Sequence, residues 1–519
     1  MGTNVDTAAT VRIDRRPVGV AVIRIYNTLT RTTEPLVPRV PGEVGLYVCG
    51  MTVYDHCHIG HARAMMAFDV VVRHLRRRGL RVKFVRNHTD VDDKILARAL
   101  ELGVPPLELS AQFIAELDAD LDAVGILRPD VAPQVSDHIP EVVAMIEALL
   151  TKEHAYLAAN GDVYFSIESS PGYGKLSGRK IDELREGARV AVDPNKRHPG
   201  DFALWKSVPD SADLGWSAPF GRGRPGWHIE CSAMAARHLG EQFDLHGGGI
   251  DLVFPHHENE IAQSECASGH RPFATVWMHN GHLTLVDAAG EPVKMSKSLG
   301  NVVRIRDLVE RVPAEALRLM YVDTHYRSPL PFSDQKLADA LAVLDRVYLA
   351  RETVDEVVGR GVSAPLDQLP DSARDAHALA TAFVAKCDAA MDDDFNSAAA
   401  IGHFFELVRA INRFGNDKKA RARGADALRP ALDAFAVVAE VFGIAALTPA
   451  AYFDEAKGKR MRAQGRSVEA IDALVAERSA ARAAKDWARA DAARVQLDEA
   501  GITVMDGADG STWRVRIDA

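Results

Sequence analysis

The first part of the chain contains an apolar run, a helical stretch and an alternating run in close succession. Residues 45–48 predict a buried strand, and residues 61–78 carry apolar side chains at helical spacing. Gly79 follows at a position favoured just after a helix, and residues 81–86 alternate as a second strand. This order predicts two neighbouring parallel strands, because such crossovers are almost always right-handed.

A second unit of the same kind lies further along the chain. A strand is predicted at residues 242–246, followed by three glycines, a helix over about residues 256–267 and a strand at residues 276–278. Residues 130–225, between the two units, are rich in Pro, Gly and charge and lack a long period. We interpret them as an insertion that splits one α/β domain.

From Pro313 onward the pattern becomes helical. Apolar residues recur at the spacing typical of amphipathic helices, and the Pro-rich residues 364–370 predict a loop between two of them. The predicted helices cover residues 314–321, 337–354, 376–390, 398–413 and 478–499.

Composition narrows the class of protein. The 519 residues are 47% apolar and 26% charged, the balance of a soluble chain with several domains. The net charge of −10 argues against a protein that coats nucleic acid through bulk charge, but residues 457–494 hold ten Lys and Arg against five Asp and Glu. Five cysteines do not indicate a disulfide framework and predict a reducing cytoplasm. No apolar run approaches the roughly 20 residues that span a bilayer, and residues 1–21 have no signal-peptide core.

The tetrapeptide from His58 to His61 stands between the first strand and its helix. A helix N-terminus offers unpaired N–H groups to phosphate, and Gly60 allows a ligand to approach the backbone. The two imidazoles can donate to charge that grows on a phosphoryl group. Taken alone, two surface histidines are an equally good interpretation.

A Lys- and Ser-rich segment follows the second unit. Lys294 and Lys297 lie three residues apart around Ser296, and two ammonium groups so placed suit a leaving pyrophosphate. Without further context, such a segment is more often a solvated loop.

A third set of residues has the chemistry of a metal site. Cys49 ends the first strand, Cys231 lies in Gly226–Ser232, and His256 and Glu260 are four residues apart, on one helix face. Two thiolates, an imidazole and a carboxylate suit Zn²⁺. His257 and His228 compete for the imidazole position, and buried, inert thiols are the alternative.

The two signature segments together resemble the HIGH and KMSKS motifs of class I aminoacyl-tRNA synthetases, which stand on the two halves of a split Rossmann fold. Further segments resemble the cysteinyl-tRNA synthetase family over nearly the whole chain after about residue 22. Met51 and His88 differ from the proline and isoleucine expected in that family. The resembling segments are residues 47–55, 86–94, 223–232, 246–263, 392–396 and 510–513.

This resemblance implies ATP-dependent ligation of L-cysteine to tRNA(Cys) through a cysteinyl-adenylate. One Zn²⁺ per chain would select the substrate thiolate, Mg²⁺ would accompany ATP, and the protein would be a cytoplasmic monomer without membrane contact. For Trp227 and Trp513, a place in a hydrophobic core is the alternative to the role that the resemblance implies. The implied roles are metal binding for Cys49, Cys231, His256 and Glu260; catalysis for His58, His61, Lys294 and Lys297; ATP binding for these four with Gly60 and Ser296; substrate binding for Thr52 and Trp227; and tRNA binding for Arg482, Asp491, Asp506 and Trp513.

The predicted fold class is α/β: a Rossmann-type parallel-sheet catalytic domain split by an insertion, then an α-helical bundle and a small C-terminal anticodon-binding domain. A mycothiol-type ligase, which joins cysteine to an amino sugar, and a non-catalytic zinc and tRNA-binding protein are the competing interpretations. The predicted divisions are residues 1–21, an N-terminal extension; 22–129 and 226–312, the two halves of the catalytic domain; 130–225, the insertion; 313–450, the helical tRNA-binding bundle; and 451–519, the C-terminal domain.

Overall fold

The computed structural model describes residues 22–180, 194–287, 290–293, 295, 300–507 and 510–516. Its central sheet is wholly parallel, with the strand order β10-β9-β3-β4. The two predicted units therefore join through the pairing of β3 with β9, and the predicted fold class is confirmed. The four strands are β3 (Glu43–Val48), β4 (Arg81–Arg86), β9 (Phe243–Gly249) and β10 (Ala274–Asn280).

The three glycines predicted to follow a strand belong to β9 itself. Gly247 and Gly248 pair with β10 at Met278 and His279. A Cβ atom on Gly247 would overlap the ring of Phe68, which α1 (Ile59–Arg77) packs against the sheet. Glycine lets the helix approach the strand closely, which an apolar pattern does not reveal.

The insertion contains a second sheet with its own core. Four short antiparallel strands lie in the order β5-β6-β7-β8 and pack against α4 (Ile139–Thr151). Three of these strands have only three residues, which is too short to leave a period in the sequence. The strands are β5 (Ala155–Leu157), β6 (Val163–Phe165), β7 (Phe202–Ser207) and β8 (Gly223–Pro225).

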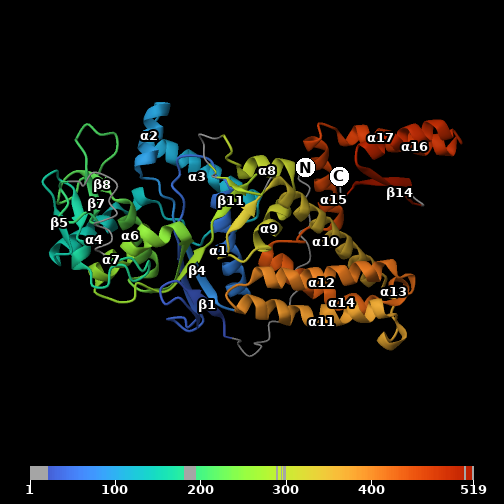
Figure 1. The fold of residues 1–519 in the computed structure, drawn as a ribbon, viewed down its shortest axis with the longest axis horizontal. Coiled ribbons are helices and arrows are strands. Elements are labelled where there is room, and N and C mark those ends of the chain that lie inside the picture. The colour runs from blue at the N-terminus through green and yellow to red at the C-terminus, as the bar shows by residue number, and fades with distance from the viewer. Residues whose placement is uncertain are drawn as a thin grey trace, which may run out of the picture.

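Helices flank the central sheet and continue into the bundle (Figure 1). Near the sheet lie α2 (Asp93–Leu102), α3 (Pro106–Ala123), α6 (Trp227–Leu239) and α7 (Glu258–Ser268). The helical region comprises α8 (Ile305–Arg311), α9 (Ala314–Val322), α10 (Asp334–Arg360), α11 (Asp371–Asp392), α12 (Ser397–Asn416), α13 (Lys418–Arg423), α14 (Ala425–Phe442) and α15 (Pro449–Ala463). Smaller strands are β1 (Arg24–Asn27), β2 (Thr32–Pro35), β11 (Leu283–Val286), β12 (Pro292–Val293) and β13 (Leu330–Phe332).

The C-terminal domain differs from the prediction in its helices. The single helix predicted at residues 478–499 is wrong, because α16 (Val468–Ala483) ends and α17 (Trp487–Glu499) begins inside it. Lys485 adopts a left-handed conformation with φ 58°, and the Asp486 side chain caps α17. The hairpin β14 (Ile502–Gly507) and β15 (Gly510–Val515) completes the domain. Within the described ranges, no helix combines the length and apolar character needed to cross a membrane.

Candidate active site and metal centre

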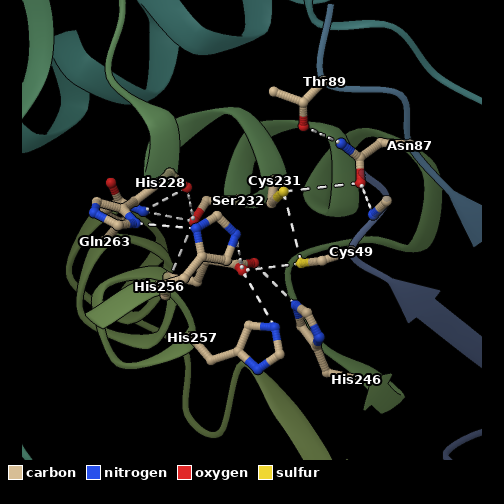
Figure 2. Close-up of polar contacts among 12 residues, drawn as sticks. Cys49, Asn87, Thr89, His228, Cys231, Ser232, His246, His256, His257 and Gln263 are labelled. Atoms are coloured by element: carbon tan, nitrogen blue, oxygen red, sulfur yellow. Dashed lines mark hydrogen bonds and ion pairs between the residues drawn. The ribbon is translucent and has the colours of Figure 1, made fainter. Parts of the chain in front are cut away.

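The four predicted metal ligands converge from three elements. Cys49 directly follows β3, Cys231 lies on α6, and His256 and Glu260 flank the start of α7. Their donor atoms all lie within 4.8 Å of one another. Cys49 Sγ is 3.7 Å from Cys231 Sγ and 3.4 Å from Glu260 Oε1, and His256 Nε2 is 3.0 Å from the same oxygen (Figure 2). Both cysteines are free thiols.

The donor set fits a zinc ion. Two sulfurs each about 2.3 Å from a tetrahedral zinc would be about 3.8 Å apart, close to the 3.7 Å observed between Cys49 and Cys231. A second, overlapping set replaces Cys231 and His256 with His246 and His257. The set with two sulfurs is the better match to zinc, which binds thiolate strongly.

The cluster carries negative charge. A hydrogen bond from Cys49 lowers the pKa of Cys231 to about 6 against the effect of burial. The pKa of Cys49 is raised instead, by burial and by its neighbour Cys231. Burial would raise the pKa of Glu260, but the adjacent His246 and His256 hold it well below its usual range. Burial lowers the pKa of His256, but Glu260 and Cys231 raise it to about 10. One thiolate and one carboxylate thus face one imidazolium, and the remaining negative charge favours a bound cation.

A layer of imidazoles surrounds the ligands. His246 Nε2 is 2.9 Å from Glu260 Oε2, and His228 Nδ1 is 3.0 Å from His256 Nδ1. His257 Nδ1 is 2.8 Å from His279 Nε2. Sequence reasoning assigned no role to His246 or His279. His246 stands at the middle of β9, and His279 stands near the carboxyl end of β10, the edge where ligands bind in parallel sheets.

The two predicted substrate-binding residues lie at different points near the cluster. The Trp227 ring is 4.5 Å from that of His256, centroid to centroid, and Trp227 is 40% exposed, which excludes the core alternative. Thr52 forms a backbone bridge with Thr89, beyond the ends of β3 and β4. Asn87 accepts a hydrogen bond from the Gly50 N–H at 2.9 Å and so holds the turn after Cys49.

The predicted phosphate-binding turn caps α1. His58 Nδ1 accepts hydrogen bonds from the N–H groups of Gly60 and His61, which places the ring proton on Nε2. The His58 and His61 rings are stacked with centroids 3.6 Å apart. A Cβ atom on Gly60 would approach the His58 ring and Met295 at 3.0–3.3 Å, so this position is tight.

A pocket of about 630 Å³ brings the two signature segments together. His58 and His61 line it with Met295, Gly300 and Arg304. Ile59 N donates to Val303 O at 3.0 Å, which joins the backbones of the two segments. The predicted residues Lys294, Ser296 and Lys297 lie outside the described residues.

Known proteins resemble the chain along most of its length. The family model for the tRNA synthetases class I (C) catalytic domain matches residues 35–342, the DALR domain matches residues 386–446, and the cysteinyl-tRNA ligase anticodon binding domain matches residues 467–514. Cysteine–tRNA ligases from Geobacter metallireducens and Geobacter sulfurreducens are 47% and 48% identical, over 95% of this chain and 100% of theirs. The chain belongs to the cysteine–tRNA ligase family.

Solved structures agree with the fold of this ligase. Mycobacterium tuberculosis methionyl-tRNA synthetase in complex with methionyl-adenylate has a TM-score of 0.60 at 15% identity, covering 77% of this chain and 92% of that one. An arginyl-tRNA synthetase from Campylobacter jejuni has a TM-score of 0.54 at 13% identity, covering 78% and 93%. At such identities the likeness concerns the fold alone.

In the C-terminal domain of the ligase, the predicted tRNA-binding residues have different surroundings. Arg482 pairs with Asp506 on an exposed surface, and Asp491 pairs with Arg494. Trp513, in contrast, is only 6% exposed; its Nε1 donates to Asp472 at 2.6 Å. Trp513 therefore lies in the core of the domain, as the alternative interpretation predicted.

Sequence reasoning missed Trp487. It begins α17 and is 62% exposed, unlike Trp513. It stands four residues before the predicted Asp491 and two residues from each of the basic residues Lys485 and Arg489. An aromatic ring inside the basic segment 457–494 was the available signal.

Proposed function

We propose that the chain activates L-cysteine with Mg·ATP to a cysteinyl-adenylate and then transfers the cysteinyl group to tRNA(Cys), with one zinc ion per chain selecting the thiolate. The observation that carries this proposal is the convergence of Cys49, Cys231, His256 and Glu260. Of these ligands, Cys49 precedes His58 by only nine residues along the chain. Amino-acid recognition and phosphate binding would thus share the carboxyl edge of β3.

The metal ligands suit discrimination of cysteine from serine. Zinc bound by them would prefer the soft thiolate of cysteine to the hydroxyl of serine. An apolar pocket would discriminate between these two amino acids by only about 1–3 kcal/mol. Cys49 and Cys231 supply the two sulfurs, and the pKa of Cys231 near 6 makes it a thiolate at neutral pH. Trp227 would cover the open side, and Thr52 would line the substrate pocket.

The phosphate-binding turn supplies positioning and charge stabilisation rather than a nucleophile. The cysteine carboxylate would attack the α-phosphate, forming a C(=O)O–P bond while the bond to pyrophosphate breaks. His58, with its proton on Nε2, would donate to the phosphoryl oxygens, with His61 beside it. Gly60 leaves room for the nucleotide. Lys294, Ser296 and Lys297 would hold the leaving phosphates.

In the second step, a ribose hydroxyl at the 3′ end of the tRNA would attack the carbonyl carbon, and AMP would leave. Arg482, Asp491 and Asp506 would read the anticodon, as predicted. We assign base stacking to the exposed Trp487 instead of Trp513, because a stacked base needs an open ring face. The helical bundle and C-terminal domain favour tRNA over an amino sugar as the acceptor.

The test combines metal analysis with two assays on one sample. Cysteine-dependent ATP–pyrophosphate exchange, aminoacylation of tRNA(Cys) and about one zinc per chain are expected. Zinc removal should abolish the preference for cysteine over serine, and restored zinc should return it. A folded, zinc-free protein that keeps the preference would contradict the metal's role. The predicted cytoplasmic location, monomeric state and domain boundaries stay predictions.

A further inference from the structure

Glu116 lies between the two segments that meet at the nucleotide pocket. It stands on α3, and its Oε2 atom is 2.6 Å from His56 Nδ1, two residues before His58. The same Oε2 is 3.0 Å from Arg306 Nη1 on α8. Gln112 donates to the other oxygen, Oε1, at 3.0 Å. One carboxylate thus contacts both the turn that precedes α1 and the helix that follows segment 294–298.

Arg306 is also held by Asp120, one turn further along α3. Its Nε and Nη2 donate to the two Asp120 oxygens at 3.1 and 3.3 Å. A planar guanidinium that spans two carboxylates has a defined orientation. Because Arg306 and Glu116 are 33% and 24% exposed, water screens the pair, and the contact contributes little to stability. The contact therefore serves to orient Arg306 more than to stabilise the fold.

The backbones of the two segments are paired at the same place. Ile59 N donates to Val303 O at 3.0 Å, and Ile305 N donates to Cys57 O at 3.3 Å. Residues 57–59 and 303–305 therefore run antiparallel. The Glu116 bridge from His56 to Arg306 extends this pairing by one residue on each side, through a third element.

We propose that Glu116 is a positioning residue for adenylate formation: it fixes residues 303–306 relative to the His58 turn. This inference rests on the proposed function. In the proposed function, Lys294 and Lys297 hold the leaving pyrophosphate, and residues 303–306 follow these lysines closely in the chain. Transfer from a preformed adenylate to tRNA involves no pyrophosphate, and Glu116 should not affect it.

The decisive variant is Glu116→Gln, which removes the charge and keeps the size. In cysteine-dependent pyrophosphate exchange, the KM for ATP should rise and kcat should fall, each by about three- to tenfold. Single-turnover transfer from preformed cysteinyl-adenylate should keep its wild-type rate, and Glu116→Asp should recover part of the exchange. Glu108→Gln is the matched control, because it makes the same charge change on an exposed position of α3.

A second comparison tests the link to Arg306. The double variant Glu116→Gln with Arg306→Gln should be no slower in exchange than the worse single variant, because both break one bridge. If Glu116→Gln does not fold, Arg306→Lys takes its place. This variant keeps the positive charge but loses the planar guanidinium that spans the two carboxylates. Additive losses, equal slowing of exchange and transfer, or an unchanged KM for ATP would each overturn the inference. Absence of cysteine-dependent exchange in the wild type would instead refute the proposed function.

Discussion

His246 Nε2 lies 2.9 Å from Glu260 Oε2, while the other carboxylate oxygen, Oε1, faces Cys49 at 3.4 Å and His256 at 3.0 Å. The two oxygens of Glu260 thus have different partners. The imidazole ring is itself held by stacking on Trp277, with centroids 4.3 Å apart. His246, which is outside the proposed ligand set, therefore orients the ligand Glu260.

From this contact we expect His246→Ala to weaken zinc binding. Loss of an outer partner of a ligand typically costs about 10- to 100-fold in metal affinity. Competition with a zinc chelator measures the change. His270→Ala is the control, because His270 is exposed and pairs with Glu241 away from the cluster. Equal zinc affinity of the two variants would show that His246 does not orient Glu260.

Gly50→Ala should disturb the turn that carries Cys49. A Cβ atom there would overlap the Asn87 carbonyl oxygen, and overpacking costs about 1–3 kcal/mol of unfolding free energy. Urea unfolding measures the loss. Gly402→Ala on α12 is the control: nothing lies near its added methyl, so it should stabilise the helix by about 0.5–1 kcal/mol. Wild-type stability of Gly50→Ala would contradict the described turn.

His279 predicts a dependence of stability on pH. Burial and the neighbouring His246 lower the pKa of His279 to about 3. Between this value and about 6.5, the unfolded chain binds a proton that the folded chain does not, so stability falls as the pH falls through that window. In metal-free protein, His279→Gln should reduce this slope by up to about 1.4 kcal/mol per pH unit. Unfolding curves at pH 5 and pH 7 test it; an unchanged slope would mean that His279 does not contribute.

The two tryptophans of the C-terminal domain should respond differently to substitution. Trp487→Ala should weaken tRNA binding by about 1–3 kcal/mol, the value of one stacked base, and leave the melting temperature unchanged. Trp513→Ala should destabilise the domain by about 3–5 kcal/mol, because it empties a core position. Filter binding and thermal unfolding separate the two effects. If Trp513→Ala alone weakened tRNA binding in a stable protein, the assignment of Trp487 would be wrong.

Much of the fold follows from local pattern. The strand at residues 81–86 has the predicted bounds, and the predicted helix over residues 314–321 differs from α9 by one residue. The break at Lys485 was not predictable in this way, because alanine-rich sequence on both sides favours helix and only the cap of Asp486 divides it. Nor were the short strands of the insertion, whose pairing is decided between distant segments.

By itself, the sequence determined which residue types could perform the chemistry: the His58 turn before an amphipathic helix, and cysteines beside histidine and glutamate. Such signals are local, because they depend on spacing within one helix or strand. Only the tertiary structure decided that Cys49 and Cys231, 182 residues apart, lie 3.7 Å from each other, and that Trp487 is exposed while Trp513 is buried. The distance between two side chains and the exposure of a side chain depend on how separate elements pack. The residue spacing within one segment does not determine that packing.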